Sequence, residues 1–319
     1  MNVVNGGNDF SKGDLIMRKV LLATTALVAM SVTAAQADVS IGGQAVFEIY
    51  SPSTGSQTFS TDGAINVKGS STTDSGLTFT ALSQLKFEGG AVNDSYIDIK
   101  GDFGSIRMGD TDAALDRMDG AVGASMDLEG TGSGSAADTR VNLAASATQI
   151  GNGDPMAISF FAPSMNGLSF YGQAEADGAG SGFGVNYSIA GVSLMAQSIQ
   201  DQTFSANEGT TDEAVDATSI GVSFSMAGVK FGMGSATWDS TPTQEKITAT
   251  DIGVSYSTGD MTLVATSASG KQGTRTDKYS NVGVSYTIAP GVTAMVESGR
   301  GEVAANDYDA TWMGLAVDF

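Results

Sequence analysis

An alternation of apolar and polar side chains, with a period of two residues, runs through this chain to its last residue. In the final segment, 308–319, the apolar parity ends with Met313, Leu315, Val317 and Phe319. The other parity carries Trp312, Gly314, Ala316 and Asp318. Since successive side chains of a strand point to opposite faces, this segment is predicted to be a β-strand with one apolar face. Such a strand either closes a barrel or forms the edge of a soluble β-sandwich.

Similar alternation marks sixteen segments along the chain. They are 38–50, 59–69, 77–88, 95–100, 105–109, 157–162, 168–176, 183–189, 192–200, 218–225, 229–238, 248–257, 261–268, 279–288, 292–299 and 308–319. Short turns alternate with longer polar loops, which include 201–217, 239–247, 269–278 and 300–307. This plan is typical of an all-β transmembrane antiparallel barrel, with short periplasmic turns and longer external loops. Because 59–69 and 93–100 show the weakest alternation, fourteen or eighteen strands remain alternatives to sixteen.

The composition agrees with strands that meet an apolar phase on one side and water on the other. Hydrophobic residues make up 41% of the chain, yet its mean hydropathy is only +0.02, and no long apolar run follows residue 37. The chain has no Cys, which excludes disulfides and thiolate nucleophiles. It has no His either, which removes His-based triads and the commonest zinc ligand. We therefore expect neither enzymatic activity nor a cofactor.

The N-terminal residues are predicted to be absent from the mature protein. Residues 17–37 read as a secretory signal peptide, with basic Arg18 and Lys19, an apolar stretch over 20–32 and a small-x-small cleavage site at 35–37. The apolar stretch is shorter than the ~20 residues of a transmembrane helix, which argues against an anchor. Because Met17 is a second plausible start, residues 1–16 are interpreted as an upstream extension from a mis-assigned start. The barrel domain is then 38–319.

The mature chain is strongly acidic. Residues 38–319 hold 12 Lys and Arg residues and 33 Asp and Glu residues, a formal net charge of −21. Nucleic-acid binding requires clustered basic side chains, so no nucleic-acid partner is expected. If the barrel encloses a pore, this charge predicts a mild preference for cations at low salt, because the field raises the local concentration of counter-ions.

The alternation stops over one long stretch, residues 110–156. Five acidic side chains in it are candidate functional residues: Asp112, Asp116, Asp119, Asp127 and Glu129. A stretch of this length without alternation is unusual inside a regular β-array and is usually functional. The same carboxylates could simply be solvated. They could also bind Ca²⁺ through their oxygens, although no EF-hand spacing is present.

Two local motifs resemble those of a known family. Thr72-Thr-Asp-Ser-Gly-Leu77 precedes a strand, and Gly101-Asp-Phe-Gly-Ser-Ile-Arg-Met-Gly-Asp110 leads into the long interruption. With the signal peptide and the terminal Phe319, they resemble the trimeric general porins of alphaproteobacteria over essentially the whole mature chain. The resemblance implies a trimer of sixteen-stranded barrels in the outer membrane of a Gram-negative bacterium, each with a water-filled pore. It also implies that the third external loop, 110–156, folds into the lumen as a constriction loop, and that the barrel-assembly machinery reads the terminal strand.

The parity of the early strands predicts which charges line the pore. A Lys or Arg facing lipid at mid-membrane costs about 2–4 kcal/mol, so the basic residues of these strands are assigned to the lumen. They are Lys68, Lys86, Lys100 and Arg107. In porins of the kind that the chain resembles, such a basic wall opposes acidic residues of the constriction loop, and the field between them orients dipolar solutes. Lys68 and Lys100 lie near short turns and could line only the periplasmic mouth.

The function that follows is passive diffusion of ions and small hydrophilic solutes. A substrate-specific channel is the first alternative; it would often carry an aromatic track along the lumen, and no such track is evident at inward positions. A surface-exposed barrel or adhesin without transport is the second. Outer-membrane lipids and lipopolysaccharide are further expected partners. Aromatic residues near strand ends are interpreted either as membrane-interface girdles or as ordinary strand packing: Phe231, Trp238, Tyr256, Tyr286, Trp312 and Phe319.

Overall fold

The computed structural model describes residues 38–87, 92–110, 156–175, 180–204, 213–242, 245–303 and 306–319. They form sixteen strands: β1 (Asp38–Pro52), β2 (Thr58–Thr72), β3 (Thr78–Lys86), β4 (Val92–Gly101), β5 (Gly104–Asp110), β6 (Met156–Phe161), β7 (Leu168–Glu175), β8 (Ser181–Ile189), β9 (Val192–Phe204), β10 (Glu213–Met226), β11 (Val229–Trp238), β12 (Ile247–Thr258), β13 (Met261–Gln272), β14 (Arg275–Ala289), β15 (Val292–Val303) and β16 (Asn306–Asp318). No helix in this described part is long and apolar enough to cross a membrane.

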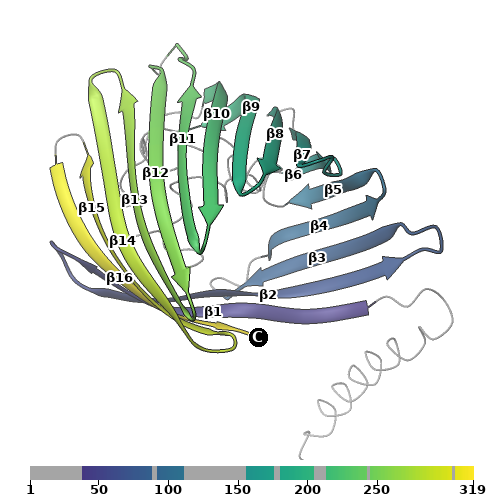
Figure 1. Cartoon of the computed structure of the whole chain (residues 1–319), viewed down its shortest axis with the longest axis horizontal. Helices are drawn as coiled ribbons and strands as arrows, with labels where there is room; N and C mark the ends of the chain where they lie inside the picture. The colour runs from purple at the N-terminus through teal and green to yellow at the C-terminus, as the bar shows by residue number, and fades with distance from the viewer. Residues whose placement is uncertain are drawn as a thin grey trace, which may run out of the picture.

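The strands form one closed antiparallel barrel. Each strand pairs with its neighbours in the sequence, and β1 completes the ring by pairing with β16. Figure 1 shows these two strands, from opposite ends of the chain, lying side by side. The predicted barrel and its number of strands are therefore confirmed, and the weakly alternating segments are the strands β2 and β4.

The barrel inverts the usual distribution of apolar side chains. Along β12, residues alternate strictly between buried and exposed from Ile247 to Val254, with Asp251 buried and its neighbour Ile252 exposed. Residues directly opposite one another in a ladder share a face, so this parity can be carried from strand to strand around the ring. The outward face is predominantly apolar where it meets lipid, and the inward face carries most of the strand charges, as a transmembrane barrel requires.

The predicted external loop 201–217 is shorter than expected, because β9 reaches Phe204 and β10 begins at Glu213. Two other predicted loops are shorter as well. The predicted loop 269–278 is wrong, because β13 extends to Gln272, β14 begins at Arg275, and the two strands pair almost to the turn. The predicted loop 300–307 likewise shrinks, since β15 reaches Val303 and β16 begins at Asn306. In both places the strands continue beyond the apolar band, where both faces are polar. Backbone hydrogen bonds persist there, but the apolar alternation that marks a strand in the sequence is absent.

Several predicted features lie outside the described residues. These are the upstream extension 1–16, the signal peptide 17–37, and residues 111–155 of the expected constriction loop, with their five candidate carboxylates.

The inward face also holds apolar and aromatic side chains that the sequence did not lead us to expect there. Trp238 (4% exposed) and Trp312 (2% exposed) are buried on the inward parity, so their interpretation as membrane-interface residues is wrong. By contrast, Phe231, Tyr256 and Tyr286 are exposed on the outward face, as the girdle interpretation expects. A contiguous inward patch on β9–β12 is also buried: Ile199, Ala217, Ala236, Trp238, Ile247 and Ala249. The parity of Trp238 with Lys230 in the same strand could have revealed its orientation.

Closure of the ring depends on a close approach between Gly43 and the terminal Phe319. The Gly43 N–H donates to the Phe319 carbonyl at 2.8 Å, and the Phe319 N–H donates to the Gly43 carbonyl at 3.0 Å. A Cβ atom at residue 43 would collide with the carbonyl oxygen of Ala64 and lie 2.9 Å from the Phe319 ring. Only glycine leaves room for both Ala64 and Phe319 at this point of the β1–β16 closure, which we call the seam.

We expect Gly43→Ala to destabilise the folded barrel by about 1–3 kcal/mol, the usual cost of overpacking. The matched control is Gly69→Ala in β2, where an added Cβ atom would meet nothing within 4 Å. The measurement is the fraction of heat-modifiable, folded barrel on electrophoresis after a graded temperature series. Equal transition temperatures for the two variants would contradict this account of the seam.

Candidate functional site

The structure places the four predicted basic residues on the inward face of four adjacent strands. Lys68 belongs to β2, Lys86 to β3, Lys100 to β4 and Arg107 to β5. Their ladder partners share this parity: Lys86 lies opposite Ala64, Lys100 opposite Thr78, and Arg107 opposite Asp98. The four strands therefore present a continuous, partly basic wall to the lumen.

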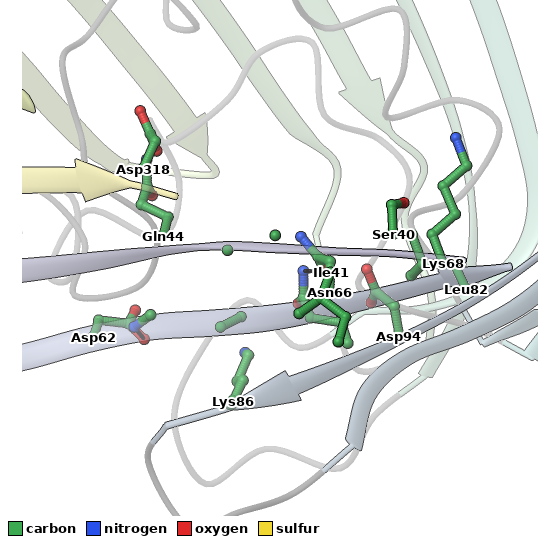
Figure 2. A pocket seen from close by; sticks show the side chains of 15 residues that line it. Ser40, Ile41, Gln44, Asp62, Asn66, Lys68, Leu82, Lys86, Asp94 and Asp318 are labelled. Atoms are coloured by element: carbon green, nitrogen blue, oxygen red, sulfur yellow. Dashed lines mark hydrogen bonds between the residues drawn. The ribbon is translucent and has the colours of Figure 1, made fainter. Parts of the chain in front are cut away.

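Lys68 and Lys86 line the same groove on the inner wall. The groove has a volume of about 780 Å³ and runs over β1–β4 with the end of β16. Figure 2 shows Asp318 and Gln44 together, Lys86 beside β2, and Lys68 further along the groove with Asp94. The amide of Gln44 donates to Asp318 at 2.8 Å, and Gln84 donates to Asn66 at 3.1 Å. These amide and carboxylate side chains beside the lysines were not predicted from the sequence.

Arg107 has a different environment. Its side chain is buried, its guanidinium carbon lies 3.8 Å from the centroid of the Tyr96 ring, and its Nε lies 3.9 Å from an Asp98 carboxylate oxygen. Stacking on an aromatic face combined with an adjacent carboxylate holds a guanidinium in a fixed orientation. Arg107 is thus a positioned charge of the inner wall, whereas Lys68, Lys86 and Lys100 extend into exposed space.

Four buried carboxylates on other strands form an acidic wall, which was not predicted from the sequence. They face inward from β1, β12, β14 and β15: Glu48, Asp251, Asp277 and Glu297. β12 lies eight strands from β4 in either direction around the ring, so part of this acidic wall lies across the lumen from the basic wall. The inward parity of these positions was a sufficient signal to find them in the sequence.

Hydrogen bonds hold three of these carboxylates in place. The amide of Asn281 donates to Glu297 at 2.7 Å, and its oxygen accepts from the backbone N–H of Thr266 at 3.1 Å and from the Thr266 hydroxyl. Arg275 donates to both oxygens of Asp277, at 3.0 and 2.6 Å. Ser60 donates to Glu48 at 3.1 Å. The Glu297 and Glu48 charges fixed in this way contribute a steady field without the cost of reorienting, whereas the Arg275 charge balances that of Asp277.

The acidic residues predicted at 112–129 lie outside the described residues, so their place relative to these walls stays a prediction. Among the residues described, no group of three or more metal-binding side chains is assembled. The candidate functional features that the described strands provide are therefore the basic and acidic side chains on opposing parts of the inner wall.

Comparison with known proteins gives the same architecture. The family model described as Gram-negative porin matches residues 23–315. The trimer form of OmpT from Vibrio cholerae superposes with a TM-score of 0.68 at 13% identity, over 89% of this chain and 99% of that one. An anion-selective porin from Comamonas acidovorans gives 0.69 at 13% identity, over 89% and 100%. A variant of Rhodobacter blastica porin gives 0.62 at 18% identity, over 88% and 100%. None of the curated proteins matches the chain significantly.

The structural likenesses, all below 20% identity, establish the fold, and the family model covers nearly the whole sequence. The match to this family confirms that the protein is a channel and not an enzyme. The alternation, the closed ring and the charged lumen are what passive diffusion through an apolar bilayer requires. The chain belongs to the Gram-negative porin family, as an outer-membrane β-barrel channel for the passive diffusion of small hydrophilic solutes.

Proposed function

We propose that this porin prefers cations at low salt and that the opposition of its acidic and basic inner walls sets that preference. The main support for this proposal is that buried carboxylates lie on β12, β14, β15 and β1, whereas the basic side chains lie on β2–β5. The net charge of the mature chain adds to the effect, because an acidic lumen concentrates cations. The likeness to the anion-selective Comamonas porin does not contradict this proposal, because a structural match at 13% identity indicates a shared fold and does not indicate shared charged residues.

A second part of the proposal concerns residues 110–156. We retain them as a constriction loop in which Asp112, Asp116, Asp119, Asp127 and Glu129 add negative charge to the lumen. The position of the segment between β5 and β6, and its length, support this role. Binding of Ca²⁺ by this acidic segment is a further prediction, supported only by its carboxylates.

The proposed assembly is a homotrimer. The OmpT structure is a trimer form, and the resemblance to the trimeric general porins of alphaproteobacteria supports the same state for this chain. We further propose that outer-membrane lipids and lipopolysaccharide contact the outward face. The barrel-assembly machinery would read Met313, Leu315, Val317 and Phe319, which are all exposed hydrophobic side chains at the C-terminal end.

Single-channel recording of the purified protein in a planar bilayer tests the channel and its proposed assembly. We expect ohmic steps that close in three equal levels. In a salt gradient, the reversal potential should indicate cation preference near 0.1 M salt, where the Debye length is about 10 Å, and weaken near 1 M, where it is about 3 Å. Single closing steps would contradict the trimer, and an anion-leaning potential would contradict the assigned selectivity.

Arg107→Gln tests the contribution of the basic wall. Removing this fixed positive charge leaves Asp98 in the lumen, so the cation-to-anion permeability ratio near 0.1 M salt should rise about two- to fivefold, as expected for a charge at partly screened distance. Lys271→Gln makes a comparable charge change on the outward face of β13 and serves as the control. A similar rise in both variants, or in neither, would refute a specific role for Arg107.

The processing prediction is tested by intact mass and N-terminal peptide analysis of protein isolated from outer membranes. Cleavage after Ala37 should leave Asp38 as the first residue. The same analysis of the precursor should detect a start at Met17, and a precursor peptide containing Asn8 would contradict the proposed upstream extension.

A further inference from the structure

The groove over β1–β4 has a floor of small side chains and charged side chains at both ends. Inward Gly42 and Ala64 lie on its floor, so the wall itself recedes there. Asp62 and Lys68 face inward from the same strand, six residues apart, which is roughly 20 Å at 3.3 Å per residue. A solute along β2 would therefore meet a carboxylate near one end and an ammonium group near the other.

The charges at the two ends of the groove are not equivalent. Asp62 is joined at its end by Asp318, which lies opposite Gln44 in the ladder, and by Lys86, which lies opposite Ala64. At the other end, Lys68 projects from β2, with Asp94 on β4. The first end thus holds two carboxylates and one ammonium group, and the second holds one of each, with the Lys68 side chain exposed. This polarity favours a solute that carries its own positive and negative charges at separate ends.

The middle of the groove supplies amide groups. Asn66 and Gln84 line it between the charged ends, and Gln44 lies beside Asp318 at the first end. An amide side chain both donates and accepts hydrogen bonds, which matches the donors and acceptors of a peptide backbone. None of the described residues that line the groove is aromatic, so it lacks the stacking surface of an aromatic track.

We infer that this groove is a weak, saturable binding site for short zwitterionic peptides during their passage through the pore. The peptide ammonium lies toward Asp62 and Asp318, its carboxylate toward Lys68, and its amides along Gln44, Asn66 and Gln84. An extended chain spans about 3.3–3.6 Å per residue, so peptides of about three to five residues fit between the charged ends once the side chains reach inward. This inference deepens the channel function and rests on it.

The test uses the full-length purified porin in a planar bilayer with KCl as the current carrier. Tetraglycine is the probe, and N-acetyl-tetraglycine amide is its uncharged counterpart. We expect tetraglycine to reduce the current along a saturating curve with millimolar half-saturation, and the capped peptide to reduce it only in proportion to concentration. Superimposable curves for the two peptides would overturn the inference while leaving the channel intact. Absence of any KCl conductance would instead contradict the channel.

Matched variants locate the site. Asp62→Asn and Lys68→Gln should each raise the half-saturating concentration of tetraglycine at least fivefold. The amide introduced by Asp62→Asn retains an oxygen that can accept the Gly63 N–H, which donates to the Asp62 carboxylate at 2.6 Å in the native chain. The change therefore removes the charge and keeps the local hydrogen bond.

Two further variants are the controls. Asp309→Asn and Lys271→Gln make the same chemical changes on the outward face and should leave the blocking curve unchanged. Folding of each variant is checked by heat-modifiability. Equal effects from the inward and outward pairs would show that net charge, and not this groove, governs the block.

Discussion

The structure depends on pairing every backbone N–H and C=O group that crosses the hydrocarbon layer. An unpaired group there costs several kcal/mol, and a sheet can avoid this cost only by closing on itself. Here the closing contact is the β1–β16 ladder, which ends in the reciprocal hydrogen bonds of Gly43 and Phe319. The terminal aromatic residue is therefore a structural partner of the first strand as well as the last side chain of the lipid-facing surface.

Closure also determines where the charges lie. With lipid outside, the inward parity of each strand must accept the polar and ionised side chains, and the ring then places strands eight apart across a shared space. Arg107 and Glu297 occupy different parts of that space, and neighbours hold each of them in place. Arg107 stacks on Tyr96, while Glu297 accepts a hydrogen bond from Asn281. The resulting field is a property of the barrel wall itself, to which the acidic segment 110–156 is proposed to add.

The lumenal groove illustrates how a passive channel acquires preferences without a dedicated binding domain. The small inward residues Gly42 and Ala64 leave space on the inner face of the barrel, and longer side chains on neighbouring strands surround that space. Because the rise per residue of a strand is nearly constant, residue count alone sets the spacing of charges along β2. Diffusion through such a lumen is then biased by the match between solute and wall charges, while the water-filled path stays open to small ions.

The sequence by itself determined the barrel and the two faces of its strands. A period of two, short turns and an uninterrupted terminal strand indicate sixteen lipid-facing strands, with fourteen or eighteen as alternatives, because a bilayer makes each departure from that pattern costly. The same rule assigns Lys68, Lys86, Lys100 and Arg107 to the lumen. The sequence was weaker where both faces of a strand are polar, as at 269–278, because no apolar alternation remains there to mark the ladder.

Only the tertiary structure decided which inward residues act together: Lys68 and Lys86 share a groove, whereas Arg107 pairs with Asp98. Such groupings depend on strand register and ring closure, which bring together residues hundreds of positions apart. The period of the sequence assigns a side chain to a face of the sheet, but the order and stagger of the strands decide which side chains are its neighbours.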